Sequence, residues 1–141
     1  MSEQRTWIKN PLAVFTANSL DARGGIVIEG QKIAELLAAG QQPSQRVDHI
    51  YDASESVLLP GLINTHHHFY QTLTRAWAPV VNVPLFPWLK KLYPVWARLG
   101  PEALGLASRV AMAELLLSGC TTTTDHHYLF PQGMEEAIDD R

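Results

Sequence analysis

The sequence predicts an α/β protein in which a small strand-rich segment precedes alternating strands and helices. Three observations support this prediction. Residues 1–58 contain short apolar and β-branched runs separated by turn signals, residues 59–141 alternate strand-like runs with a long helical pattern, and three adjacent histidines follow the first of these later runs. We therefore expect a β-sandwich segment over 1–58 and two strand–helix units over 59–141.

The strand-rich segment is punctuated by Asn, Pro and Gly residues, which favour turns between short strands. A small antiparallel sheet is the simplest arrangement for such runs. Residues 40–45 are polar and are predicted to form a loop, whereas residues 35–39 would suit a helical turn as well as a strand. The expected strands are 7–8, 13–15, 25–30, 31–36 and 47–51.

The run LPGLINTHHH, residues 59–68, places His66 and His68 at an i, i+2 spacing. On a strand this spacing puts both imidazoles on one face, about 6 to 7 Å apart, where they can converge on one metal ion. His67 would then point to the opposite face. The alternative is a solvated turn or a chance cluster, but the histidines end an apolar strand, which is where α/β barrel enzymes carry their chemistry.

A helix is expected after Gly100, because Pro101 suits the first helical position and Glu102 the first turn. Gly119 is a suitable C-cap. An apolar stripe at helical spacing is predicted to cover the sheet. Its members are Ala103, Leu106, Val110, Ala113 and Leu117.

The β-branched run 121–124 predicts the second strand of this part, and Asp125, His126 and His127 follow it. Because side chains alternate along a strand, one of these histidines faces inward and the other faces the helices. The sequence leaves open which one lines the pocket.

A connection rich in proline and aromatic residues lies between the first strand and the helix. Long connections of this kind are usually functional or disordered, and the aromatic content argues against disorder. We interpret residues 77–88 as a lid or pocket wall, with Trp77, Phe86 or Trp88 available to stack on a flat substrate. The alternative is that these aromatic residues only pack the loop onto its own domain.

The run LPGLINTHHH together with SGCTTTTDHH, residues 118–127, resembles the amidohydrolase superfamily. Within it, the chain is similar to the branch of guanine and 8-oxoguanine deaminases, cytosine deaminase-like enzymes and triazine hydrolases. The resemblance implies the N-terminal portion of a (β/α)8 TIM barrel preceded by a small β-sandwich. It also implies that His66 and His68 bind one divalent metal ion, with zinc preferred to iron.

The same resemblance suggests a substrate contact at Gln71, because related deaminases carry a glutamine three positions after the second histidine of the pair. An amide offers both donors and an acceptor, which suits the edge of a lactam heterocycle. An exposed loop glutamine is the alternative. The catalytic acid–base residues and the remaining metal ligands of the family come from later strands, so they are expected beyond Arg141.

Length limits what these residues can do alone. A complete barrel takes about 250 residues, whereas this chain has 141 and its barrel would be incomplete. Two ligands are also too few for a tight catalytic zinc site. Residues 132–141 are predicted to begin another helix. We therefore expect the chain to be the N-terminal part of a longer enzyme and to be inactive alone.

The predicted activity of the parent enzyme is hydrolytic deamination of an amino-substituted heterocycle, with 8-oxoguanine or a related purine or pterin preferred. The same motif would serve a triazine-type hydrolase that displaces chloride or an alkylamine. A non-catalytic fragment or binding module is the alternative from another class.

Composition narrows the partners of the protein. A net charge of −3 argues against nucleic acid, and one cysteine excludes an internal disulfide framework. No signal core and no run of about 18 apolar residues is present, so the expected location is the cytoplasm, away from membranes. The expected partners are a small heterocyclic substrate and water, and homo-oligomerisation is left open.

Overall fold

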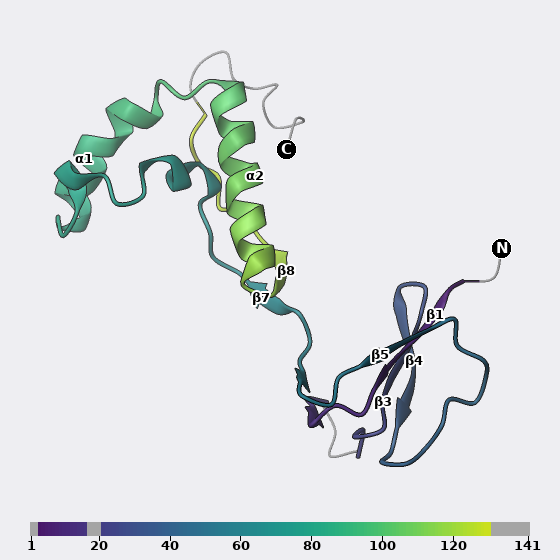
Figure 1. Ribbon diagram of the computed structural model, residues 1–141. Helices are drawn as coiled ribbons and strands as arrows, with labels where there is room; N and C mark the ends of the chain where they lie inside the picture. The colour runs from purple at the N-terminus through teal and green to yellow at the C-terminus, as the bar shows by residue number, and fades with distance from the viewer. Residues whose placement is uncertain (1–2, 17–20, 131–141) are drawn as a thin grey trace. The chain divides into compact units, whose positions relative to one another are not determined.

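The computed structural model describes residues 3–16 and 21–130, which belong to two compact units that divide between Pro60 and Gly61 (Figure 1). The first unit consists of strands and loops, and the second contains all the helices of the described residues. The predicted boundary between residues 58 and 59 lies two residues from this division. The helix expected over 132–141 lies outside the described residues.

The first unit is built around a four-stranded sheet in the order β4-β3-β1-β5. Its strands β1, β3 and β4 pair antiparallel, whereas β5 pairs with β1 in parallel. Residues 35–37 belong to β4, so this stretch is a strand and not the helical turn that the sequence also allowed. Two short strands, β2 and β6, form a separate parallel pair. The bounds are β1 Arg5–Lys9, β2 Ala13–Val14, β3 Gly25–Glu29, β4 Lys32–Leu37, β5 His49–Asp52 and β6 Val57–Leu58.

A small core holds this sheet together. Trp7, Val27 and Leu37 are buried, and Val47 packs against them. The Trp7 indole Nε1 donates a hydrogen bond of 3.0 Å to the carbonyl oxygen of Gly24, which satisfies its only polar atom. This core is small, so the polar contacts at its edge contribute noticeably to the stability of the unit.

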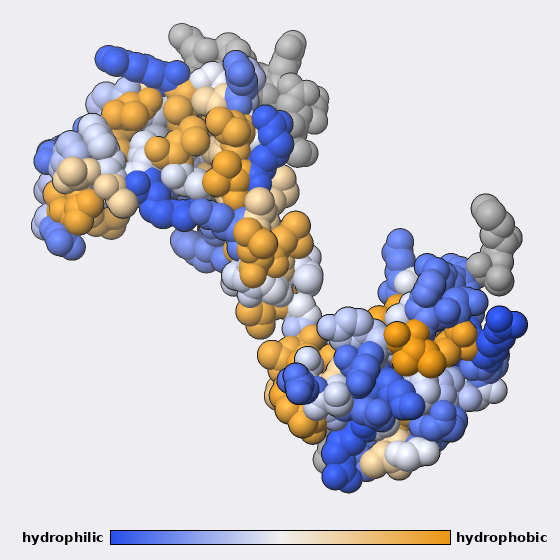
Figure 2. All heavy atoms as spheres, in the orientation of Figure 1, coloured by the Kyte–Doolittle hydropathy of each residue, from blue (hydrophilic) through white to orange (hydrophobic). Residues whose placement is uncertain are grey.

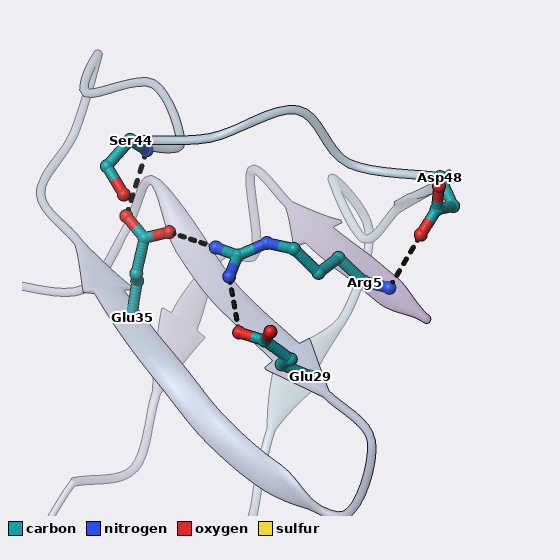
Figure 3. Close-up of polar contacts among 5 residues, drawn as sticks. All are labelled: Arg5, Glu29, Glu35, Ser44 and Asp48. Carbon is teal, nitrogen blue, oxygen red and sulfur yellow. Dashed lines mark hydrogen bonds and ion pairs between the residues drawn. The ribbon is translucent and has the colours of Figure 1, made fainter. Parts of the chain in front are cut away.

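The main polar contact of the first unit is made by Arg5, which is 8% exposed (Figure 3). Its guanidinium binds Glu29 and, at 2.5 Å, the carboxylate of Glu35. Its backbone N–H donates to Asp48 Oδ2 at 2.8 Å, and Glu35 also accepts from the Ser44 backbone at 3.0 Å. Arg5 therefore connects β1 to β3, to β4 and to the loop before β5.

Replacing Arg5 with alanine is expected to destabilise the first unit by about 2 to 3 kcal/mol. The change leaves two carboxylates facing each other without their cation, and the effect stays below that of a fully buried pair because Glu29 is partly exposed. Denaturant unfolding of the variant measures it. Arg23→Ala is the control, since Arg23 and Asp21 form an exposed ion pair and should leave the midpoint unchanged. Equal midpoints for the two variants would contradict the role of Arg5.

The second unit is a parallel strand pair with its connection. Strand β7 (Leu62–Asn64) pairs with β8 (Cys120–Thr123), and the chain between them forms η1 (Phe69–Thr74), η2 (Ala78–Val80), α1 (Leu85–Trp96) and α2 (Pro101–Leu117). Helix α2 runs beside β8 (Figure 1). Gly61 precedes β7 because a Cβ there would lie 1.9 Å from Thr121 Oγ1. The described residues contain two strands of the expected barrel and do not close one.

The connection is more regular than the sequence predicted. Residues from Leu85 onward form helix α1, so Phe86 and Trp88 are helical and do not lie in a loop. Pro87 and Pro94 made this helix hard to predict from the sequence, because proline lacks the backbone N–H that a helix interior uses and therefore argues against a helix. Pro87 is tolerated because it lies in the first turn, where the N–H groups have no helical partner.

Helix α2 begins and ends as predicted, at Pro101 and before Gly119, whose φ of +83° is typical of a glycine C-cap. The prediction of its buried face was wrong. Leu117 is 89% exposed and Leu106 is 49% exposed. The helix is apolar on more than one side, so periodicity alone does not select the packed face. The buried residues are Leu104, Ala107, Ser108 and Ala111.

The core of the second unit is formed by residues from η1, η2, α1 and α2 together with Leu129. Trp96 is fully buried and its ring contacts Tyr70, Trp88 and Tyr93 in edge-to-face geometry. Trp88, Leu89 and Leu99 pack against this core from its rim. The buried members are Tyr70, Val80, Leu92, Trp96, Leu104 and Leu129.

Apolar side chains also remain at the surface of both units, where Figure 2 shows them in orange. In the second unit they include Ile63 on β7 and Leu116 on α2, which are 69% and 65% exposed. No helix among the described residues is long and apolar enough to span a membrane.

Candidate metal centre

The candidate site forms where β7 and β8 end. Their parallel pairing continues past both strands, because the Thr124 N–H donates to the Asn64 carbonyl at 3.1 Å and the His126 N–H donates to the His67 carbonyl at 2.8 Å. The Asn64 side chain accepts from the His66 N–H at 2.9 Å and so turns the chain after β7. Two segments separated by 59 to 60 residues in the chain therefore lie side by side.

His66 and His68 lie together as the spacing predicted, although β7 ends at Asn64 and the histidines follow the strand. Their ring centroids are 5.0 Å apart. His126 joins them, with its ring centroid 4.6 Å from that of His66 and 5.8 Å from that of His68. One nitrogen of each ring lies within 4.8 Å of the other two. Three imidazole nitrogens are a donor set that fits a catalytic divalent metal ion with an open position.

The tautomer of His68 follows from its hydrogen bond. Its Nδ1 lies 2.7 Å from the carbonyl oxygen of His126. A carbonyl only accepts, so Nδ1 carries the hydrogen and the neutral ring keeps its lone pair on Nε2. Such a hydrogen bond orients a metal-binding histidine and raises its basicity. Nε2 of His68 is therefore the atom available to a metal ion.

His67 does not belong to this cluster, and its ring packs against Phe69, with ring centroids 5.0 Å apart. Its Nδ1 is buried and has no hydrogen-bond partner among the described residues. Burial lowers the pKa of His67, an effect that the nearby Asp125 carboxylate opposes. His67 is thus a packing residue beside the site.

The structure answers which histidine after β8 faces the site. His126 lies beside His66 and His68, whereas the His127 ring packs on Tyr70 and its Nε2 lies 2.7 Å from the carbonyl oxygen of Leu129. Asp125 accepts the Phe69 N–H at 3.0 Å, which ties the start of η1 to the end of β8. Period-two alternation could not make this choice, because both histidines follow the last residue of the strand.

A cavity of about 480 Å³ opens beside the histidines. Gln71 and Trp88 both contribute to its wall, whereas Trp77 and Phe86 are 41% and 74% exposed. The predicted aromatic wall is therefore provided by Trp88, which also packs against the core. The full lining is His66, His67, His68, Gln71, Thr72, Thr74, Arg75, Ala76, Val80, Val81 and Trp88.

Gln71 is held in place by two tyrosines. Its Nε2 lies 3.3 Å from the Tyr70 hydroxyl and 3.2 Å from the Tyr128 hydroxyl. Neither tyrosine was predicted from the sequence to belong to the site. The signal that could have identified Tyr128 is its position two residues after His126, at the same strand end as the histidine pair.

Comparison with known proteins identifies the family. The Amidohydrolase family model matches residues 57–140. The chain is 74% identical over 135 residues to an 8-oxoguanine deaminase of Pseudomonas aeruginosa, covering 96% of this chain and 30% of that relative. It is 46% identical over 71 residues to a hydroxydechloroatrazine ethylaminohydrolase of Pseudomonas sp. strain ADP, covering 49% of this chain and 15% of that protein.

Solved structures agree with this assignment. A triazine hydrolase from Arthrobacter aurescens superposes with a TM-score of 0.87 at 28% identity, covering 98% of this chain and 32% of that chain. An atrazine chlorohydrolase variant complexed with zinc and atraton gives a TM-score of 0.82 at 28% identity, covering 96% of this chain and 32% of that chain. The chain spans about a third of the length of these proteins. It belongs to the amidohydrolase family.

Proposed function

We propose that the whole protein is a metal-dependent hydrolase that deaminates an amino-substituted heterocycle, with 8-oxoguanine as the preferred substrate. The observation that carries this proposal is the convergence of His66, His68 and Gln71 on one cavity. A metal-binding pair and a ring-binding amide in one pocket suit hydrolysis of a bound heterocycle. The 74% identity to an 8-oxoguanine deaminase supports the choice of substrate.

In this proposal His66 and His68 hold one divalent metal ion, and the backbone of His126 keeps His68 in the tautomer that can bind it. The ion, when bound, lowers the pKa of water so that hydroxide forms near neutral pH. Imidazole ligands suit both zinc and iron. Zinc is preferred because a structural relative was solved with zinc.

The remaining side chains bind the substrate and restrict water. Gln71 contacts the polar edge of the ring, and Trp88 offers an aromatic wall to its face. The buried Trp96 packs on Trp88 and so supports this wall, and the buried Tyr70 packs on Trp96. These residues orient the ring so that its amino-bearing carbon faces the histidine pair, which is the positioning that hydrolysis requires.

We further propose that residues 59–141 form the first two units of a (β/α)8 barrel and that 1–58 form part of a β-sandwich. The parallel β7–β8 pair with its helical crossover supports this arrangement. The other metal ligands and the groups that move protons would come from later strands of the whole protein. Its partners would be the heterocycle and water, in the cytoplasm.

A triazine hydrolase is the second candidate. The structural similarity to a triazine hydrolase and the 46% identity to an ethylaminohydrolase favour it. The same histidine pair could serve the displacement of ammonia, an alkylamine or chloride from an electron-poor ring, so these residues alone do not separate the two reactions.

The leaving group separates the two candidates. We expect the zinc-loaded whole protein to release ammonia from 8-oxoguanine with a kcat/KM above about 10⁴ M⁻¹s⁻¹, and to release chloride or ethylamine from triazines far more slowly. A coupled ammonia assay, chloride titration and amine detection on one preparation measure this. Turnover of triazines without turnover of any purine or pterin would replace the proposal with the second candidate.

A further inference from the structure

The hydrogen bonds of Gln71 show which end of its side-chain amide, the NH₂ or the carbonyl oxygen, contacts the neighbouring tyrosines. The oxygen of a tyrosine hydroxyl can accept a hydrogen bond from an amide N–H. The NH₂ of Gln71 contacts both tyrosines, because its Nε2 donates to the Tyr70 hydroxyl at 3.3 Å and to the Tyr128 hydroxyl at 3.2 Å.

This arrangement uses both N–H groups of Gln71 on the two tyrosines. Among the described residues no donor reaches Gln71 Oε1, so the carbonyl oxygen is the part of the amide that remains for a ligand in the cavity. An isolated glutamine can present either end to a ring. With both tyrosines in place, this one presents an acceptor.

We propose that Tyr128 is a positioning residue that makes Gln71 a hydrogen-bond acceptor and so selects rings with an N–H at the contacted edge. The inference rests on the proposed function, because it assigns a task to Gln71 within that site. A lactam N–H can donate to the Gln71 carbonyl oxygen. An unprotonated ring nitrogen is itself an acceptor, so it would face that oxygen without a hydrogen bond between them.

The two tyrosines differ in how far the fold depends on them. Tyr70 is 1% exposed and packs on Trp96 and His127, so removing it would disturb the core. Tyr128 is 43% exposed, and its ring packs at 5.3 Å on His68. Tyr128→Phe keeps that ring contact and removes only the hydroxyl, which makes it the informative variant.

The test is a double-mutant cycle in the whole zinc-loaded protein, with Tyr128→Phe, Gln71→Ala and both together. We expect Tyr128→Phe to raise KM for 8-oxoguanine about fivefold to tenfold, as loss of one neutral hydrogen bond would, with kcat changed less than about twofold. In the Gln71→Ala background the same substitution should have almost no further effect. Tyr93→Phe is the matched control, because Tyr93 is also 43% exposed and also lies at an aromatic contact.

A second measurement on the same variants is the dissociation constant of urate. Urate is the product that deamination of 8-oxoguanine would give, and it is a lactam with no amino group to lose. Urate binding should weaken in Tyr128→Phe by the same factor as KM rises. An effect of Tyr128→Phe that is equally large with and without Gln71 would overturn the inference while leaving the deaminase proposal intact. If the wild-type protein turns over triazines only, the deaminase proposal fails, and the same cycle on the triazine KM decides whether Tyr128 acts through Gln71.

Discussion

Replacing His66 or His68 with alanine is expected to remove the metal ion from the whole protein and to lower kcat/KM by about a thousandfold or more. Each histidine supplies one of the three imidazole nitrogens that converge within 4.8 Å. Removing either one leaves two, which is fewer than the three protein ligands usual in a catalytic zinc site. Lewis-acid activation is worth several kcal/mol of transition-state stabilisation, which corresponds to this loss of rate. Metal content by inductively coupled plasma mass spectrometry and steady-state kinetics measure the two effects separately.

His49→Ala is the control for this prediction, because His49 lies on β5 in the first unit and is exposed. It should keep both the metal content and the activity of the wild type. Full metal occupancy in both His66→Ala and His68→Ala, with activity within tenfold of the wild type, would contradict the assignment of these residues as ligands.

Replacing Trp96 with alanine is expected to destabilise the protein by about 3 to 5 kcal/mol. Trp96 is fully buried among Tyr70, Trp88 and Tyr93, so the change leaves a large cavity in the core below the site. It also removes a hydrogen bond of 3.1 Å from the indole Nε1 to Thr74 Oγ1. Denaturant unfolding of the whole protein gives the change in free energy, and its midpoint should fall clearly.

Phe86→Ala provides the comparison, since Phe86 is an aromatic residue of the same helix and is 74% exposed. Its substitution should change the free energy of unfolding by less than about 0.5 kcal/mol. Trp96→Phe should recover much of the stability by filling most of the cavity. A Trp96→Ala protein as stable as Phe86→Ala would show that the core does not depend on this indole.

The proximity of His66 to His68 and the ends of α2 could be predicted because each depends on local rules. His66 lies beside His68, as an i, i+2 spacing predicts for extended chain at a strand end. Pro101 and Gly119 mark a helix start and stop. Both predictions use only neighbouring residues in the sequence and do not depend on which distant segments pack together.

The features that could not be predicted depend on which segments meet in space. Helix α1 contains two prolines that conceal it, and α2 is apolar on several sides, so only packing selects its buried face. The positions of His126 and Tyr128 depend on hydrogen bonds that continue the β7–β8 pairing past the strands. The alternation of side chains along a strand predicts their direction only within the strand, and both residues lie beyond the end of β8.

The most direct test of the account is the position of zinc in a crystal of the whole protein, located by anomalous scattering at the zinc edge. We predict a single strong peak within about 2.0–2.1 Å of a ring nitrogen of both His66 and His68, with Nε2 as the contacting atom of His68. A fully occupied zinc site that involves neither histidine would contradict the account.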